Sequence, residues 1–574
     1  MAECGILSSI DWIILIVYYA ALAAFGIFKG SRGKGLDGYF RGNRTVSWWV
    51  VGLSVMATQA SAITFIGTTG QAYSEGMTFI QMYLAVPLVM VTLCVSFVPF
   101  FYKADIYTAY EYLERRFDSK TRTLASLIFL VQRALAVGIV IYAPSVVLAI
   151  LLGWDERTVI LLTGAGAVLY TAIGGVLAVA WTDAVQMLLM FAGVFIVPIA
   201  ILLQLPPGIT PADVIYIGGL TQKWTMVDFT LDLSRSFTIY SGILGGLFLG
   251  LSYFGCDQSQ VQRYITATSL REGRISLLFN GFAKIPMQLL ILATGILVFV
   301  FFHFQPPPLL FNRAEISRVT GSVNADRYRI LENDYSRALD QRRQQVLELV
   351  QQRRNSPEGL QSKALTAYRD TQRRILDLRQ RAAALAAETS GRPYEDINYV
   401  YPTYILRYLP VGIVGIMIAV IFSAASSTIT AELTALSSVT MVDFYRRFLM
   451  RSRGDSHYLM ASRVCTLFWG AFAVAVALSA GRLGSLIVAV NKVGSYFYGS
   501  LLGVFILAIF VKKSTGLGAF VGLLCGMAVV YATSELTSIA WLYYNVIGTL
   551  VVLGVGLGIS AVQRVLGAGK PNPS

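Results

Sequence analysis

Four hydroxyl side chains lie in the stretch Ala424-Ala425-Ser426-Ser427-Thr428-Ile429-Thr430, inside an apolar segment, residues 404–440, that is long enough to cross a bilayer. Hydroxyl oxygens at that depth are typical of a site for a small hard cation. A second apolar segment, residues 49–66, is interrupted by the small and polar run Ala57-Thr58-Gln59-Ala60-Ser61-Ala62. The two segments together predict an ion site between a broken membrane helix and a neighbouring helix. Small residues also let membrane helices pack closely, so packing alone is an alternative interpretation of either segment.

The composition indicates a polytopic membrane protein. The chain has 574 residues, 55% of them hydrophobic, and its mean hydropathy is +0.62. Apolar stretches of about twenty residues, the length that spans a hydrocarbon core of ~30 Å, recur along the chain. The sequence predicts thirteen spans, at residues 8–28, 47–71, 77–101, 122–152, 157–178, 183–204, 238–257, 274–303, 404–440, 460–480, 485–511, 516–534 and 539–562.

Lysine and arginine are concentrated in alternate connections between these spans. Short basic loops stay in the cytoplasm, so thirteen spans with a basic C-terminal tail predict an external N-terminus and a cytoplasmic C-terminus in the plasma (inner) membrane. The net charge of +14 is then a consequence of topology and does not indicate a nucleic-acid partner. The sequence shows no nucleophile–base pair, phosphate loop or metal-ligand cluster, so an enzyme is not expected.

One charged stretch, residues 304–402, separates a first membrane part, 1–303, from a second, 403–574. It begins with Pro306-Pro307-Pro308 and is rich in Arg, Gln and Glu. Apolar residues recur in it at helical spacing before and after Asn355-Ser356-Pro357, which predicts an extracytoplasmic antiparallel helical hairpin. One interpretation is a solvated spacer or self-packing lobe, and another is a cap that docks a partner or collects anions. The sequence does not identify such a partner.

Many motifs of the chain resemble those of the sodium/solute symporters. That family contains the sodium-coupled sugar, proline, iodide, multivitamin, monocarboxylate and sialic acid transporters. The resemblance covers nearly the whole chain apart from the insertion, and it rests on residues 38–42, 48–67, 108–113, 138–142, 170–175, 181–186, 257–264 and 421–445. It implies an all-α fold of five plus five helices in an inverted repeat, with one additional helix before them and two after. The first helix of each repeat, here 47–71 and 238–257, is expected to be discontinuous, with binding near the midplane.

The resemblance also implies a site for a coupling Na⁺ ion. Its ligands fall on the backbone carbonyls of Ala57, Ala60 and Ala424 and on the hydroxyls of Ser427 and Thr428. Five neutral oxygens suit a hard monovalent cation and bury no fixed negative charge. Bound sodium would bridge the two helices and stabilise the outward-open arrangement.

Some members of the family bind a second sodium ion. Asp183 and Thr430 match that position, but Ala431 replaces a serine. Glu432, next to it, is an intramembrane carboxylate that serves either as a substitute ligand or as the partner of a buried base. The resemblance therefore leaves open whether one or two ions are bound.

A solute pocket is implied by the resemblance to the sugar branch. Its positions fall on Gln59, Thr64, Tyr83, Gly250, Tyr253, Phe254, Gln258, Lys284 and Asn491. Tyr83 replaces a glutamate that accepts hydroxyl protons in the sugar transporters, which disfavours a polyhydroxylated sugar. Lys284 and Arg133 are cations inside apolar spans, where each needs a substrate, a carboxylate or water as a partner. These three residues favour a small organic anion such as a monocarboxylate, while a structural role for Lys284 stays open.

The sequence as a whole predicts a sodium-coupled symporter that imports a small solute by alternating access. One alternative is a transporter-like sensor or receptor without net transport. Another is proton coupling, with Asp183 or Glu432 as the carrier. The expected partners are the solute, sodium and the lipid bilayer.

Overall fold

The computed structural model describes residues 7–30, 35–152, 154–355, 362–391, 394–480 and 486–566. These residues form helices, with one isolated bridge between Val46 and Ala267. The elements before the insertion are α1 (Ser9–Gly30), α2 (Gly35–Arg41), η1 (Gly42–Arg44), α3 (Trp48–Gln59), α4 (Ala62–Glu75), η2 (Met77–Tyr83), α5 (Val86–Val95), α6 (Phe97–Ala104), α7 (Ala109–Arg116), α8 (Ser119–Leu152), α9 (Glu156–Leu203), α10 (Pro211–Leu220), η3 (Ser241–Gly245), α11 (Gly246–Cys256), α12 (Gln258–Tyr264) and α13 (Leu270–Phe304).

The insertion contributes α14 (Arg313–Thr320), α15 (Ala325–Asn355) and α16 (Ser362–Ser390). The remaining elements are η4 (Ile397–Tyr399), α17 (Val400–Tyr408), α18 (Ile413–Val439), η5 (Thr440–Leu449), α19 (Asp455–Ala477), α20 (Leu486–Phe510), α21 (Gly516–Leu536), η7 (Trp541–Tyr543) and α22 (Tyr544–Val565).

Within the described ranges, ten helices are long and apolar enough to cross a membrane, or eleven if the bent pair α3 and α4 counts as one span. Two of the thirteen predicted segments are not among them. Residues 157–178 fall largely in the first part of α9, and residues 238–257 correspond to Ser241–Cys256, which is apolar but shorter. The protein is therefore an all-α polytopic membrane protein with ten to eleven candidate spans.

Two predicted boundaries need correction. The sequence predicts separate spans at 157–178 and 183–204, and the structure divides α9 into two helical parts at Gly175, a few residues before the predicted connection. Gly175 has a φ of 62°, and a Cβ there would lie 2.8 Å from the Tyr39 ring, so both the backbone and the contact require glycine. The segment predicted at 404–440 begins only at Ile413, because the chain leaves the helical path after α17 at Leu409 and turns at Gly412, where φ is 86°.

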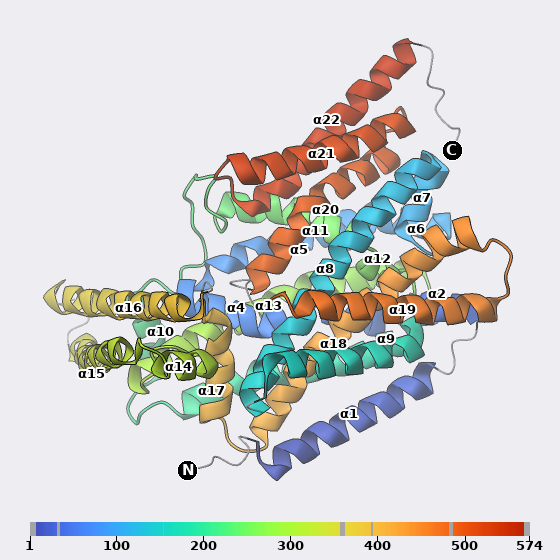
Figure 1. The fold of residues 1–574 in the computed structure, drawn as a ribbon. Helices are drawn as coiled ribbons and strands as arrows, with labels where there is room; N and C mark the ends of the chain where they lie inside the picture. The colour runs from blue at the N-terminus through green and yellow to red at the C-terminus, as the bar shows by residue number, and fades with distance from the viewer. Residues whose placement is uncertain are drawn as a thin grey trace.

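The spans run roughly side by side and form a bundle (Figure 1). α1 lies along one side of the bundle, and α21 and α22 lie along the opposite side. The buried hydrophobic residues of the bundle form one large cluster that includes side chains of α3, α4, α8, α13 and α18. This central group of helices carries the predicted ion-site segments.

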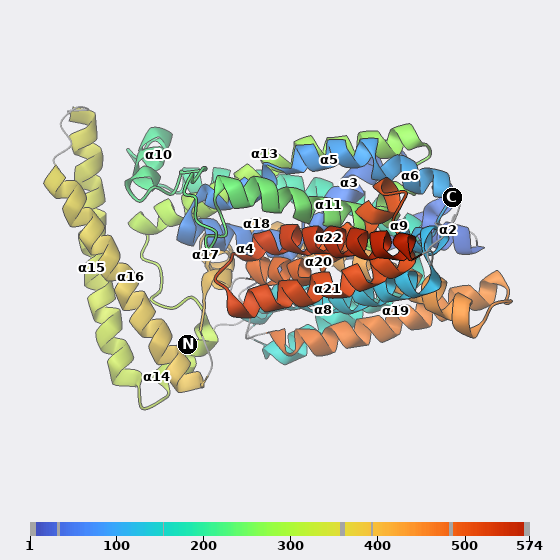
Figure 2. The same ribbon diagram turned by 90° about the horizontal axis from the view of Figure 1, so that it is seen from above.

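The insertion forms a helical layer across one end of the bundle, as Figure 2 shows. Its two long helices, α15 and α16, lie side by side and share a separate hydrophobic core that includes Tyr335, Leu339, Ile375, Leu378 and Leu385. Most of these residues lie at the helical spacing seen in the sequence. The pair therefore has its own core outside the bundle.

The insertion is attached to the bundle by polar contacts at two places. Arg342 is buried and donates to the carbonyl of Phe302 at the end of α13 (2.6 Å), and the Tyr368 hydroxyl lies 2.9 Å from Nε2 of His303. Arg353 donates to the carbonyl of Ala212 near α10 (2.8 Å). These contacts join the insertion both to a core helix and to the connection that follows α9.

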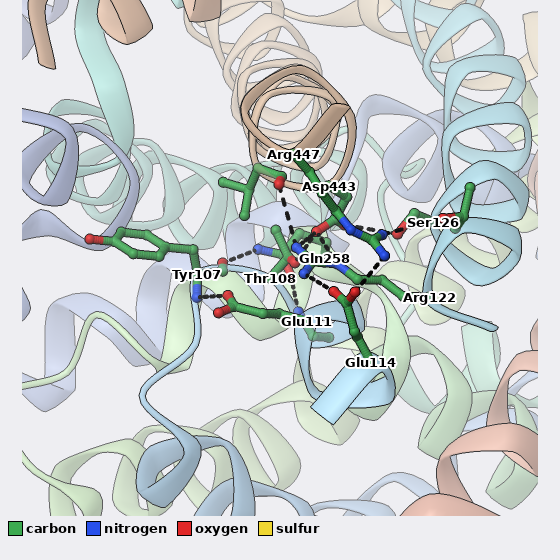
Figure 3. A network of polar contacts seen from close by, with 12 residues as sticks. Tyr107, Thr108, Glu111, Glu114, Arg122, Ser126, Gln258, Asp443 and Arg447 are labelled. Carbon is green, nitrogen blue, oxygen red and sulfur yellow. Dashed lines mark hydrogen bonds and ion pairs between the residues drawn. The ribbon is translucent and has the colours of Figure 1, made fainter. Parts of the chain in front are cut away.

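A charged network joins helices at the other end of the bundle (Figure 3). The buried carboxylate of Asp443 in η5 accepts hydrogen bonds from Thr108 (2.8 Å), Ser126 (2.8 Å) and the Nε of Arg122 (3.0 Å). Arg122 also bonds to Glu114 (2.7 Å), which is partly exposed. The network therefore holds α7, α8 and η5 together.

We expect Asp443→Ala to lower the free energy of unfolding by about 3–5 kcal/mol, because Arg122 would lose its buried partner. Glu114→Gln is the matched control, since its partly exposed pair with Arg122 is expected to contribute only about 0–1 kcal/mol. Thermal unfolding of both variants in detergent measures the difference. Equal unfolding temperatures for the two variants would contradict this account of the network.

Candidate functional site

The first predicted site segment is a helix break. α3 ends at Gln59, α4 begins at Ala62, and the two helices are bent by 57°. Ala60 has left helical geometry, with φ −85° and ψ 73°, and Ser61 makes no side-chain cap to α4. Ala57 and Ala60 are fully buried. The small residues of this run therefore lie inside the bundle, where backbone groups near the break are accessible to a ligand.

The second predicted segment lies against this break. The hydroxyl of Thr428 on α18 donates to the carbonyl of Thr58 (3.2 Å) and to the carbonyl of Ala424 (3.1 Å). The Ser427 hydroxyl is buried and has no hydrogen-bond partner among the described residues. Thr58, the residue after the predicted ligand Ala57, therefore provides the α3 carbonyl that contacts α18.

These groups fit an alkali ion. The Thr428 hydroxyl lies beside two backbone carbonyls, and the unpartnered oxygen of the preceding residue, Ser427, is available as a ligand. All of these oxygens are neutral, which suits a hard monovalent cation. The structure thus brings Thr428 into contact with the segment that contains Ala57 and Ala60.

The three residues considered for a second ion, Asp183, Thr430 and Glu432, each have different hydrogen-bond partners. Asp183 on α9 accepts a hydrogen bond from Ser54 (2.7 Å), and its other carboxylate oxygen has no partner among the described side chains. The Thr430 hydroxyl donates to the Ser427 carbonyl (3.0 Å). Glu432 bonds to Arg133 (2.6 Å). Of the two roles considered for Glu432, the structure shows the pairing with a buried base.

A cavity of about 120 Å³ lies next to the helix break. Eight of the predicted solute residues line it, namely Gln59, Thr64, Tyr83, Arg133, Gly250, Tyr253, Phe254 and Asn491. Thr58 and Thr428 line the same cavity. The candidate ion position therefore adjoins the space available to a solute.

Gln258 and Lys284 are not among the lining residues. The amide of Gln258 accepts from the backbone of Ala109 (2.9 Å) and donates to the carbonyl of Tyr107 (2.8 Å), as Figure 3 shows. Gln258 thus joins α12 to the start of α7 instead of facing a solute. Lys284 is fully buried on α13, with its ammonium 5.6 Å from the centre of the Tyr83 ring.

Arg133 lies in an ion-pair cluster that the sequence did not predict. Its guanidinium pairs with Asp257 and with Glu432, and it donates to the Tyr498 hydroxyl (2.6 Å). Asp257 occupies the break between α11 and α12, where its other carboxylate oxygen caps α12 by accepting from Ser259 (2.9 Å). The cluster therefore links α8, α18 and α20 to a second helix break.

Sequence reasoning identified the intramembrane charges Arg133 and Glu432 but not their pairing. Tyr498 and Gln132 also line the cavity and were missed. Tyr498 carries no local signal, because aromatic residues are abundant in this chain. Asp257 belonged to one of the motifs, but nothing in its neighbours indicated a contact with α8.

A hollow of about 780 Å³ lies beside the insertion. Its walls include Leu376 and Arg379 of α16, Gln71 of α4, and Val488 and Lys492 of α20. α20 also contributes Val490 and Asn491 to the inner cavity. The insertion therefore forms part of a space that adjoins the same stretch of α20 as the candidate solute site.

Comparison with known proteins identifies the family. The family model described as "Sodium:solute symporter family" matches residues 39–312 and 374–526. The chain belongs to the sodium:solute symporter family. The unmatched residues between these two ranges fall in the insertion, so the symporter core is shared and the hairpin lies largely outside the family model.

Several relatives are similar over most of this symporter chain. It is 28% identical over 556 residues to the sodium/sialic acid symporter SiaT of Proteus mirabilis (strain HI4320), covering 95% of this chain and 94% of that protein. It is 28% identical over 504 residues to the sodium/iodide cotransporter of Homo sapiens, covering 88% and 65%. It is 26% identical over 517 residues to the sodium-coupled monocarboxylate transporter 1 of Homo sapiens, covering 90% and 71%.

A solved structure gives the same fold. The substrate-bound outward-open state of a Na⁺-coupled sialic acid symporter matches this symporter with a TM-score of 0.76 and 26% identity, covering 97% of this chain and 98% of that chain. The protein is therefore an integral membrane protein that couples the transport of a solute to sodium. It is a transporter and not an enzyme.

Proposed function

We propose that this symporter imports a small organic anion, such as a monocarboxylate, together with sodium by alternating access. The observation that carries the proposal is that Thr58 and Thr428, which meet at the helix break, line the same cavity as the candidate solute residues. A cation held by these residues adds positive charge at the edge of a buried cavity, where charges interact strongly. Sodium binding then favours entry of an anion.

The proposed sodium ligands are the carbonyls of Ala57, Ala60 and Ala424 and the hydroxyls of Ser427 and Thr428. An ion in this position contacts both the broken helix and α18, and it stabilises the arrangement in which these elements are close. Loss of the ion to the cytoplasm releases that constraint. Asp183 and Thr430 are the candidates for a second sodium.

The proposed architecture is a five-plus-five inverted repeat within thirteen spans, counting the first part of α9 and the Ser241–Cys256 segment. The break at Ala60, inside the first helix of the first predicted repeat, supports it, and so does the break at Asp257, which falls at the end of the corresponding segment 238–257. The basic connections support an external N-terminus and a cytoplasmic C-terminus in the plasma membrane. The insertion then lies outside the cell, beside the entrance to the cavity.

Arg133 offers an anion only part of its guanidinium. Two of its nitrogens are engaged by Asp257, Glu432 and Tyr498, so an anion that binds these nitrogens competes with those partners, while Nε has no partner among the described residues. The sodium position at Thr428 supplies positive charge without that competition. The names of the relatives, which carry sialic acid, iodide or monocarboxylates, also support an anionic solute.

Uptake by reconstituted vesicles tests the proposal. Radiolabelled acetate, lactate and pyruvate are offered with an inward sodium gradient, and then with potassium in place of sodium at fixed pH. We expect accumulation in sodium and none in potassium. One sodium moved with one monovalent anion carries no net charge, so a stoichiometry of one to one predicts uptake that is insensitive to the membrane potential.

Two other results would contradict the proposal. Accumulation in potassium that follows a pH gradient would indicate proton coupling. Sodium-dependent binding without accumulation would indicate a sensor or receptor.

A further inference from the structure

Three buried side-chain acceptor atoms at the wall of the inner cavity lack a partner in the described part of the chain. They are Oε2 of Glu432 on α18, the side-chain oxygen of Gln59 at the end of α3 and that of Gln132 on α8. Two donors at the same wall, the amide nitrogen of Gln132 and Nε of Arg133, also lack a partner among the described residues. All of these residues line the cavity. Buried acceptors are nearly always hydrogen-bonded in folded proteins, because an unpaired one retains its full desolvation cost. The acceptor atoms therefore mark positions where a ligand group that donates hydrogen bonds is favoured, and the two nitrogens mark positions for a group that accepts them.

The charges at this wall also favour a donor. Arg133 is paired with two carboxylates, those of Glu432 and Asp257, so the three side chains together carry one net negative charge. A bare anionic group placed beside Glu432 is repelled, whereas a hydroxyl or ammonium group is attracted. The wall beside Glu432 thus favours a group that donates a hydrogen bond, whereas sodium attracts an anionic group.

Thr428, at the proposed sodium site, and Glu432, which favours a donor group, lie about one helical turn apart. The residues are four positions apart on α18, which corresponds to about 6 Å along a helix axis, and both face the same cavity. A small solute with an acidic group at one end and a donor group a few bonds away can meet both.

We propose that the solute is a carboxylate substituted with a hydroxyl or amino group, and that this group donates a hydrogen bond to Oε2 of Glu432. The inference rests on the proposed function, because the carboxylate is assigned to the side of the cavity where sodium binds. It makes Glu432 a residue that determines specificity. Simple aliphatic carboxylates and halides lack the donor, so they leave Oε2 of Glu432 without a partner and bind weakly.

Matched sets of probes test this inference with the purified full-length protein. The first set is acetate, glycolate and glycine, the second is propionate, lactate and alanine, and iodide serves as an anion without a donor. Unfolding temperatures are measured against probe concentration in sodium, since a ligand that binds the folded state raises its stability. We expect at least one hydroxyl or amino member to reach half-saturation at a concentration about tenfold or more below that of its unsubstituted partner.

Glu432→Gln is the informative variant, because it keeps an acceptor oxygen and removes the charge. We expect it to reduce the preference for the substituted member several-fold. Glu114→Gln, at the far end of the bundle, makes the same chemical change and is expected to leave the preference unchanged. An unchanged preference in Glu432→Gln would assign the selectivity to another residue and overturn the proposed role of Glu432.

The outcome separates this inference from the proposed function. If unsubstituted carboxylates or iodide bind as tightly as their substituted partners in sodium, the inference fails while sodium coupling stands. If no substituted member stabilises the protein in sodium, the inference also fails. If substituted members bind equally well in sodium and in potassium, the proposed sodium coupling fails and the donor requirement survives.

Discussion

Arg133→Ala is expected to abolish solute uptake and to lower the free energy of unfolding by about 3–5 kcal/mol, the usual effect of removing one member of a buried ion pair. Arg133 is almost completely buried, and its removal leaves the carboxylates of Asp257 and Glu432 without their common partner. Uptake is lost because the cluster holds the break between α11 and α12 against α8, α18 and α20. Thermal unfolding in detergent and vesicle uptake measure the two effects.

A second substitution separates stability from transport. Adding Glu432→Gln to Arg133→Ala removes one of the two uncompensated charges, so the double variant is expected to recover part of the lost stability without recovering uptake. Arg235→Ala is the control for loss of an arginine, because Arg235 is exposed and its pair with Asp228 is expected to contribute about 0–1 kcal/mol. Wild-type unfolding of Arg133→Ala would show that the cluster does not stabilise the protein.

Ser427→Ala and Thr428→Val are expected to raise the sodium concentration for half-maximal uptake by about tenfold or more. Each change removes one oxygen from the proposed site, and the loss of a hydrogen-bonding or ligand group at a buried position costs about 1–3 kcal/mol. The two substitutions conserve side-chain size closely, so membrane insertion and expression are expected to be normal. Uptake measured against sodium concentration gives the result.

Ser438→Ala is the matched control for these variants. Ser438 lies on the same helix and is buried, but its hydroxyl donates to the carbonyl of Ala435 in its own turn (2.8 Å). We expect it to leave the sodium dependence unchanged. The assigned ligands would be wrong if Ser427→Ala and Thr428→Val kept wild-type sodium dependence, or if Ser438→Ala shifted it equally.

Most membrane helices were predictable because hydropathy is a property of consecutive residues. The segments at 8–28, 274–303 and 516–534 correspond closely to α1, α13 and α21. The errors occurred where the chain bends without becoming polar. Gly175 breaks α9 inside an apolar stretch, and α18 begins only after the turn at Gly412. Hydropathy does not distinguish such turns from continuous helix.

The candidate site was partly predictable for a similar reason. Hydroxyls and small residues in apolar segments are visible in the sequence. The structure places Thr428 against the 57–60 segment and eight of the predicted solute residues around one cavity. Gln258 was assigned to the solute, but its amide bonds to the backbone of Tyr107 and Ala109, about 150 residues away. Contacts at that distance along the chain leave no local pattern.

The sequence alone determined that this is a polytopic helical protein, where its hydrophobic segments lie, and which of them carry the hydroxyl and small residues proposed to bind sodium. These properties depend on the order of neighbouring residues and on the cost of placing polar groups in a bilayer. The tertiary structure decided that Arg133 is shared between Asp257 and Glu432, and that Thr58 and Thr428 line the same cavity as the candidate solute residues. Those relations arise from the packing of α8, α12, α18 and the broken α3–α4 pair, because electrostatic pairing depends on distances in space and not on separation along the chain.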